Sequence, residues 1–152
     1  MTVLVREAVI YRVPPTSNHL YRNGYHGTRV MTKEGEAFAN RVRADLSQEW
    51  IRTAPLDPDM PYQVRFVHYM PDLFNKNQGR PGKTGAPVRR FKRKDVSNMR
   101  KLLEDVVGEM IGVDDSSTLD AVSSKRLGRT HHVRIEVWQL PLSSCSDEYS
   151  DL

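Results

Sequence analysis

Cysteine and long apolar segments are both scarce in this sequence. Of its 152 residues only Cys145 is a cysteine, so no disulfide can form within the chain, which fits a reducing compartment. No apolar run approaches the roughly 20 residues that a membrane-spanning helix needs. The N-terminus, MTVLVREAVIYRV, alternates like a strand and has no apolar core typical of a signal peptide. These absences predict a cytoplasmic protein without a membrane partner.

Several motifs that would indicate a particular chemistry are also missing. The sequence has no CxxC, GxxxxGK[ST], HExxH or GxSxG pattern, which argues against zinc-ribbon, P-loop, zincin and serine-hydrolase chemistry. His131 and His132 are neighbours in an expected strand, where successive side chains point to opposite faces, so the pair cannot chelate one ion. The remaining histidines have no ligand spacing either: His19, His26 and His68.

The charge is uneven along the chain. The formal net charge is +4 and the isoelectric point about 9.3. Residues 140–152 hold three acids and no cation, which leaves +7 for residues 1–139. A basic body of this kind attracts polyanions, although such a charge can also serve only solubility. With 38% hydrophobic and 28% charged residues, the chain is expected to form one globular domain over residues 1–139, followed by an acidic, disordered tail over 140–152.

Acids are absent from residues 73–94, which carry eight cations: Lys76, Arg80, Lys83, Arg89, Arg90, Lys92, Arg93 and Lys94. Three glycines and two prolines in the same stretch predict a basic loop that is mobile without a ligand. The stretch ends at Asp95, and an amphipathic segment then leads to Asp114 and Asp115. Cations suited to phosphates therefore precede carboxylates suited to a metal, an order that favours a metal-dependent enzyme acting on nucleic acid.

Hydrophobic periodicity predicts an α+β fold. Alternation indicates strands at about 3–13, 62–70, 118–126 and 131–139, and i, i+4 stripes indicate helices at about 33–51 and 96–111. Thr32 is expected to cap the first helix, and Gly112 to end the second. The order β-α-β-α-β-β predicts two helices packed on a small mixed sheet.

Each candidate residue also has a purely structural explanation. Asp95 suits a helix N-cap as well as a metal. Ser97, Asn98 and Lys101 share one side of the second helix, which is either solvated, with Lys101 paired to Asp105, or turned towards a phosphate.

Two further segments carry the same ambiguity. Asp114 and Asp115 suit either turn chemistry or Mg²⁺, which prefers oxygen ligands. The segment after Pro14 and Pro15 either only ends the first strand or brings Asn18, Tyr21 and Arg22 to DNA or to the site.

Five passages, in order, resemble the RusA family of Holliday junction resolvases, which are common in phages and prophages. RVPPTSNHLYR resembles the opening strand and its PP turn, TKEGEAFANRV the first helix, and VRFVHYMPD the strand before the catalytic loop. KDVSNMRK resembles the motif D-x-D-N-x-x-K, and GVDDSSTLDAVSSKR the acidic turn and following strand. The likeness covers residues 3–139.

The resemblance implies a homodimer that binds four-way DNA junctions and nicks two strands symmetrically with Mg²⁺ or Mn²⁺, in a bacterial or phage-infected cell. It makes Asp95, Lys101 and Asp115 catalytic, with Asp95, Asp114 and Asp115 as metal ligands. Asn98 matches the motif asparagine. The residues expected on DNA are Arg22, Lys125 and the eight cations of the basic loop.

Two departures from the family pattern leave alternatives open. Ser97 stands where the motif has its second aspartate, so the expected metal site lacks one carboxylate, for which Asp114 or Asp120 is the candidate substitute. The basic loop is also longer than in short members. The alternatives are a non-catalytic or weakly catalytic junction-binding protein and, third, a small basic RNA-associated protein.

Overall fold

The computed structural model describes residues 1–12, 15, 19–92 and 96–146, without the side chains of Ser97, Asn98 and Asp115. Four strands form the main sheet: β1 (Val3–Ile10), β6 (His132–Gln139), β4 (Tyr62–Met70) and β5 (Thr118–Leu127), in that spatial order. β4 and β5 run parallel, whereas β6 is antiparallel to both β1 and β4. The mixed sheet predicted from the sequence is confirmed.

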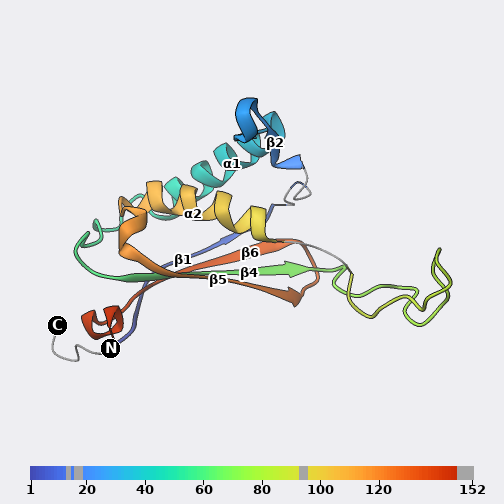
Figure 1. Ribbon diagram of the computed structural model, residues 1–152. Helices are drawn as coiled ribbons and strands as arrows, with labels where there is room; N and C mark the ends of the chain where they lie inside the picture. The colour runs from blue at the N-terminus through green and yellow to red at the C-terminus, as the bar shows by residue number, and fades with distance from the viewer. Residues whose placement is uncertain (13–14, 16–18, 93–95, 147–152) are drawn as a thin grey trace.

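Two helices, α1 (Lys33–Glu49) and α2 (Ser97–Ile111), lie on the same side of this sheet (Figure 1). Because β4 and β5 are parallel, the chain must return along the sheet between them, and α2 makes that return. α1 and α2 also pack against each other, and Arg43 on α1 forms an ion pair with Glu109 on α2 at 2.7 Å.

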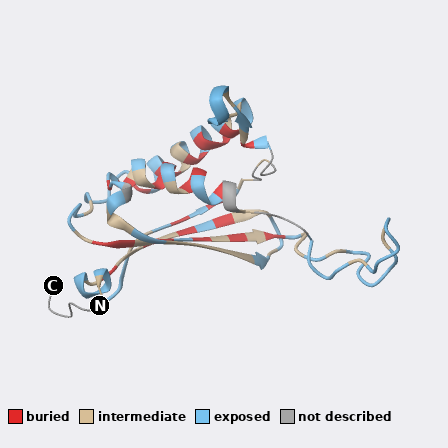
Figure 2. Ribbon diagram, in the orientation of Figure 1, coloured by how far each residue is buried: buried red, intermediate tan, exposed pale blue. Residues whose placement is uncertain are grey.

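The hydrophobic core lies between the helices and one face of the sheet (Figure 2). Along β4, Tyr62, Val64 and Phe66 are buried on the helix side, as the predicted alternation requires. α1 contributes Phe38 and Leu46, and α2 contributes a buried stripe that includes Leu102, Leu103, Val106 and Val107. The opposite face of the sheet carries no helix formed by the described residues.

Helix boundaries follow local capping chemistry. The Thr32 hydroxyl accepts a hydrogen bond from the Gly35 amide at 3.1 Å, so the predicted cap of α1 is confirmed. Gly112 ends α2 in the left-handed region at φ 68°, also as predicted. The N-cap position of α2 is Val96, which makes no side-chain capping bond. Asp95, which the sequence offers as a helix cap or a metal ligand, lies outside the described residues.

One element was missed. Residues 19–31, for which the sequence predicted no strand, contain a short antiparallel pair, β2 (Tyr21–Asn23) and β3 (Arg29–Met31). β1 also ends at Ile10 rather than near residue 13. In the predicted tail, Leu140 is buried and residues Leu142–Cys145 form a 3₁₀ turn, η4. The disorder of the tail and the domain boundary at 139 stay predictions.

Gly35 and Gly108 form a matched pair for testing this packing. A Cβ at Gly35 would lie 2.5 Å from the Leu20 carbonyl oxygen, whereas one at Gly108 would lie 3.5 Å from the Val113 carbonyl oxygen, an ordinary contact. We expect Gly35→Ala to lower the free energy of unfolding by about 1–3 kcal/mol, because α1 must move away from the chain beside β2. Gly108→Ala should raise it by about 0.5–1 kcal/mol. Urea unfolding measures both, and equal effects of the same sign would contradict the packing described.

Candidate functional site

The basic stretch and the acidic turn lie at opposite ends of α2. Residues 73–92 follow the C-terminal end of β4, near the start of α2, whereas Asp114 follows the end of α2 and precedes β5 (Figure 1). α2 rises about 1.5 Å per residue, so about 15 Å of helix separates Lys101 from Ile111. Asp114 is therefore not brought beside Lys101 within the chain. The cations and the acids, which follow one another in the sequence, lie apart in the structure.

A hollow of about 350 Å³ runs along the exposed flank of α2 towards the start of β5. Its charged lining comes from α2 alone: Arg100, Lys101, Glu104 and Asp105. Thr118, the first residue of β5, also lines it. Lys101, expected from the sequence to face a phosphate, is thus exposed in a groove together with two acids on its own helix.

The β2 strand adds Tyr21 to this region. Burial and the negative charge of Asp105 both raise the pKa of the Tyr21 hydroxyl. That hydroxyl has no hydrogen-bond partner among the described residues. The guanidinium of Arg29 lies over the Tyr21 ring, 5.7 Å from its centroid. Tyr21 is thus partly buried against the core, close enough to α2 to feel the charge of Asp105, while Arg22 is exposed on β2.

The acids at the start of β5 provide hard oxygen donors. Asp114 is exposed, and its carboxylate accepts a weak bond of 3.5 Å from the Ser116 amide, as in an ordinary Asx turn. Asp120 pairs with Gln63 across the β4–β5 ladder and is also exposed. Carboxylates of this kind suit Mg²⁺. Within the described part of the chain, however, no three acids, histidines or cysteines converge on one point.

Residues 73–92 form a hydrogen-bonded, ribbon-like arm that extends beyond the sheet (Figure 1), which we call the basic arm. Phe74 faces Phe91 and Pro81 faces Pro87 in isolated antiparallel bridges. At the tip, the Gly85 amide donates to the Gly82 carbonyl, and Gly85 takes a φ of 83°. Six cations of the arm are described, and all are exposed: Lys76, Arg80, Lys83, Arg89, Arg90 and Lys92.

Prolines are compatible with this arm because of where they lie. The Gly82 amide donates to Ala86 and the Val88 amide to Arg80, so the Pro81–Pro87 pair is one that needs no amide hydrogen. Only Lys92, among the described cations of the arm, forms an ion pair, with Asp72 at 3.1 Å. Whether the arm moves without a ligand stays a prediction.

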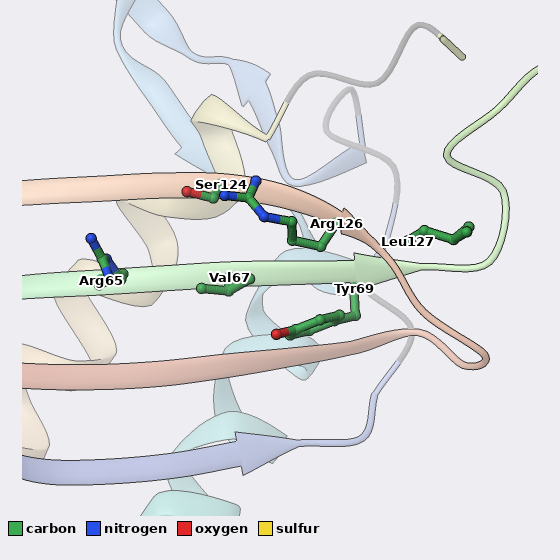
Figure 3. A pocket seen from close by; sticks show the side chains of 6 residues that line it. All are labelled: Arg65, Val67, Tyr69, Ser124, Arg126 and Leu127. Atoms are coloured by element: carbon green, nitrogen blue, oxygen red, sulfur yellow. The ribbon is translucent and has the colours of Figure 1, made fainter. Parts of the chain in front are cut away.

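A second hollow, of about 400 Å³, lies on the helix-free face of the sheet (Figure 3). Its polar lining comes from Arg65 on β4 and from Ser124 and Arg126 on β5. The residues that line it include no acid, although Glu136 reaches Arg65 at 4.0 Å. Tyr69 also lines the hollow, and its ring stacks on that of His132 with the centroids 4.4 Å apart. Two guanidinium groups and a hydroxyl suit a phosphate oxygen.

Several expected site residues are not placed. Asp95, Asn18, Arg93 and Lys94 lie outside the described residues, as do the side chains of Ser97, Asn98 and Asp115. Lys125 is placed, half-buried on β5 opposite His68 of β4. The assignment of Asp95, Lys101 and Asp115 as catalytic residues is therefore neither confirmed nor contradicted.

Comparison with known proteins supplies the decisive observation. A model of the family described as endodeoxyribonuclease RusA matches residues 11–138, most of the chain. This protein belongs to the RusA family. A comparison with curated individual proteins gives no match. RusA-family proteins are endonucleases that act on branched DNA junctions, so the resemblance recognised from five short passages is confirmed. No helix in the described part of this RusA-family chain could span a membrane.

Sequence reasoning missed three features of this RusA-family chain. Arg65 and Arg126 come together only because β4 and β5 are neighbours, which alternation within each strand cannot reveal. Tyr21 reaches α2 through a hairpin too short for a periodic signal. Glu104 joins Asp105 and Lys101 in one groove, a pairing that their helical spacing of three and four residues could have indicated.

His68 generates a prediction about pH. It is 3% exposed on the helix-covered side of β4, its Nε2 has no partner among the described residues, and burial lowers its pKa from 6.5 to about 4. Its neutral form stabilises the fold above about pH 6.5, and this contribution is lost as the pH falls towards 4, because only the unfolded chain takes up the proton. By pH 5 the free energy of unfolding should fall by about 2 kcal/mol.

Urea unfolding at pH 7.5 and pH 5 measures this loss. His68→Leu should remove most of it, whereas His19→Gln, a change at an exposed histidine, should keep it. An equal loss in wild type and His68→Leu would show that other groups cause the pH dependence.

Proposed function

We propose that this RusA-family protein is a homodimeric, Mg²⁺-dependent endonuclease that resolves four-way DNA junctions by symmetric nicking in the bacterial or phage-infected cell. The family match over residues 11–138 carries this proposal. The basic arm supports it, because six exposed cations with no acid between residues 73 and 92 suit a polyanion.

The basic arm supplies the contacts with the DNA backbone. Each Lys or Arg that neutralises a phosphate releases counterions and strengthens binding at low salt. A two-stranded ribbon also fits the major groove of duplex DNA, so the arm can follow one duplex while the body of the protein holds the branch. Arg22 on β2 and Lys125 on β5 are the other cations assigned to DNA.

Two copies are needed to assemble the catalytic site. Lys101 and the start of α2 lie at one end of the helix, and Asp114 and Asp115 lie beyond the other end. No side chain is long enough to cover the roughly 20 Å of helix between Ser97 and Ile111. In a dimer with twofold symmetry, however, the acidic turn of one copy can meet the start of α2 in its partner, and the same contact then forms twice. Two equivalent sites match symmetric nicking.

Asp95, Asp114 and Asp115 would hold the metal, with Asp120 as a further carboxylate. When bound, Mg²⁺ polarises the scissile phosphate and lowers the pKa of a coordinated water. Lys101 holds its ammonium against the phosphate and offsets the negative charge that develops as the bond breaks. The groove along α2 orients the strand, since Arg100 and Lys101 attract the backbone while Glu104 and Asp105 keep it off the rest of the helix.

A second candidate function follows from Ser97. A serine hydroxyl is a poorer Mg²⁺ ligand than the aspartate that the family motif has at this position. A protein whose metal site lacks this carboxylate binds junctions through the basic arm but cleaves them weakly or not at all. The two candidates share the DNA-binding surface and differ only in turnover.

Cleavage of a labelled four-way junction separates the two candidates. Wild type should nick it in Mg²⁺ and stop in EDTA, and Asp95→Asn should lower the rate at least about 100-fold while junction affinity is kept, because the change removes one metal-binding charge. Asp59→Asn, an exposed acid in the loop before β4, is the matched control and should cut like wild type. Cleavage by Asp95→Asn at the wild-type rate would reject the site, and junction binding without any cleavage by wild type would favour the second candidate.

A further inference from the structure

Two phenylalanines lie exposed at the base of the basic arm. Phe74 is 42% exposed and Phe91 60% exposed. Their ring centroids are 5.5 Å apart and the ring planes are inclined by 31°. Neither residue belongs to the core cluster, and both keep a substantial surface exposed to solvent. Exposed apolar surface of this kind commonly marks a site of contact.

Backbone hydrogen bonds hold the two rings in place without help from the core. The Asn75 amide donates to the Arg90 carbonyl at 2.8 Å, and the Lys92 amide donates to the Leu73 carbonyl at 2.9 Å. Phe74 and Phe91 are therefore a non-hydrogen-bonded pair, the kind in which facing side chains lie closest. The Asn75 side chain also donates to the Arg89 and Phe91 carbonyls, at 2.8 and 3.0 Å. The pair is thus preorganised.

The positive charge around Phe74 and Phe91 indicates which kind of molecule the two rings bind. Lys76, Arg89, Arg90 and Lys92 flank the two rings, and Asp72, which pairs with Lys92, is the acid just before the arm. A second copy of this chain carries a net charge of +4 and the same cations, so its arm would be repelled. Exposed aromatic rings within a cationic surface are instead the arrangement by which proteins stack on unpaired nucleobases.

We propose that the Phe74–Phe91 pair stacks on a nucleobase exposed at the branch point of the junction. This inference rests on the proposed function and deepens it. Within a duplex each base is covered by its neighbours on both faces, whereas bases at a branch can expose a face to an aromatic ring. The cations of the arm bind any DNA backbone, and the aromatic pair adds affinity only where the stack is interrupted. The pair is therefore a specificity element for branched DNA.

Equilibrium binding of the full chain in EDTA tests this, with a four-way junction and a duplex of equal length at one salt concentration. The double variant Phe74→Leu/Phe91→Leu keeps apolar bulk on the arm but removes both rings. It should bind the junction about tenfold more weakly, while duplex affinity changes less than about twofold. Phe74→Tyr/Phe91→Tyr, which keeps the rings, should retain junction affinity. Tyr25→Leu removes an aromatic ring that is 83% exposed outside the arm and should change neither affinity.

Each of the following outcomes would overturn the proposal. If the leucine variant binds junction and duplex equally more weakly, the rings only stabilise the structure of the arm. If its junction affinity is unchanged, the rings have no role in binding. A weaker dimer in sedimentation of the leucine variant would make the pair a contact between copies. If wild type itself does not prefer the junction to the duplex, the proposed function fails and this inference fails with it. If wild type prefers the junction and the leucine variant does so equally, only this inference fails.

Discussion

The packing of α2 against the parallel strands β4 and β5 is the constraint on which the rest of the structure depends. Parallel neighbours require a connection that runs back along the sheet, and the buried stripe of Leu102, Leu103, Val106 and Val107 holds α2 in that position. The basic arm consequently emerges at one end of the sheet, and the acidic turn lies at the other. This separation is the reason for our proposal that each catalytic site is built from two copies.

Most of the main elements could be predicted because their signals are local. β4 alternates between core and solvent, and α1 repeats apolar residues every four positions, so a short window of sequence suffices for each. β2 and β3 have three residues apiece and lie in a polar segment, which leaves no period to detect. Strand neighbours are set by long-range packing, so the hollow between Arg65 and Arg126 could not be predicted. The separation of Lys101 from Asp114, by contrast, follows from the length of the predicted second helix.

The basic arm shows how one composition permits two structures. Glycine and proline are frequent in mobile loops, and they are equally the residues that a tight hairpin needs. Here Pro81 and Pro87 face each other where no amide is required, and Gly85 takes the positive φ of the tip. The catalytic roles of Asp95 and Asp115, by contrast, come from the family motif and could not be predicted from local geometry. Those roles remain predictions that rest on the resemblance and on chemistry.

The claim that one site is built from two copies has a direct test in subunit mixing. Asp95→Asn and Asp115→Asn are each prepared alone and then mixed under conditions that exchange subunits, so that roughly half of the dimers contain one copy of each. If the site spans both copies, such a dimer has one intact site, and the mixture should nick one strand of a four-way junction although neither variant does so alone. If the mixture stays as inactive as its components, both acids act within a single copy and the account is contradicted.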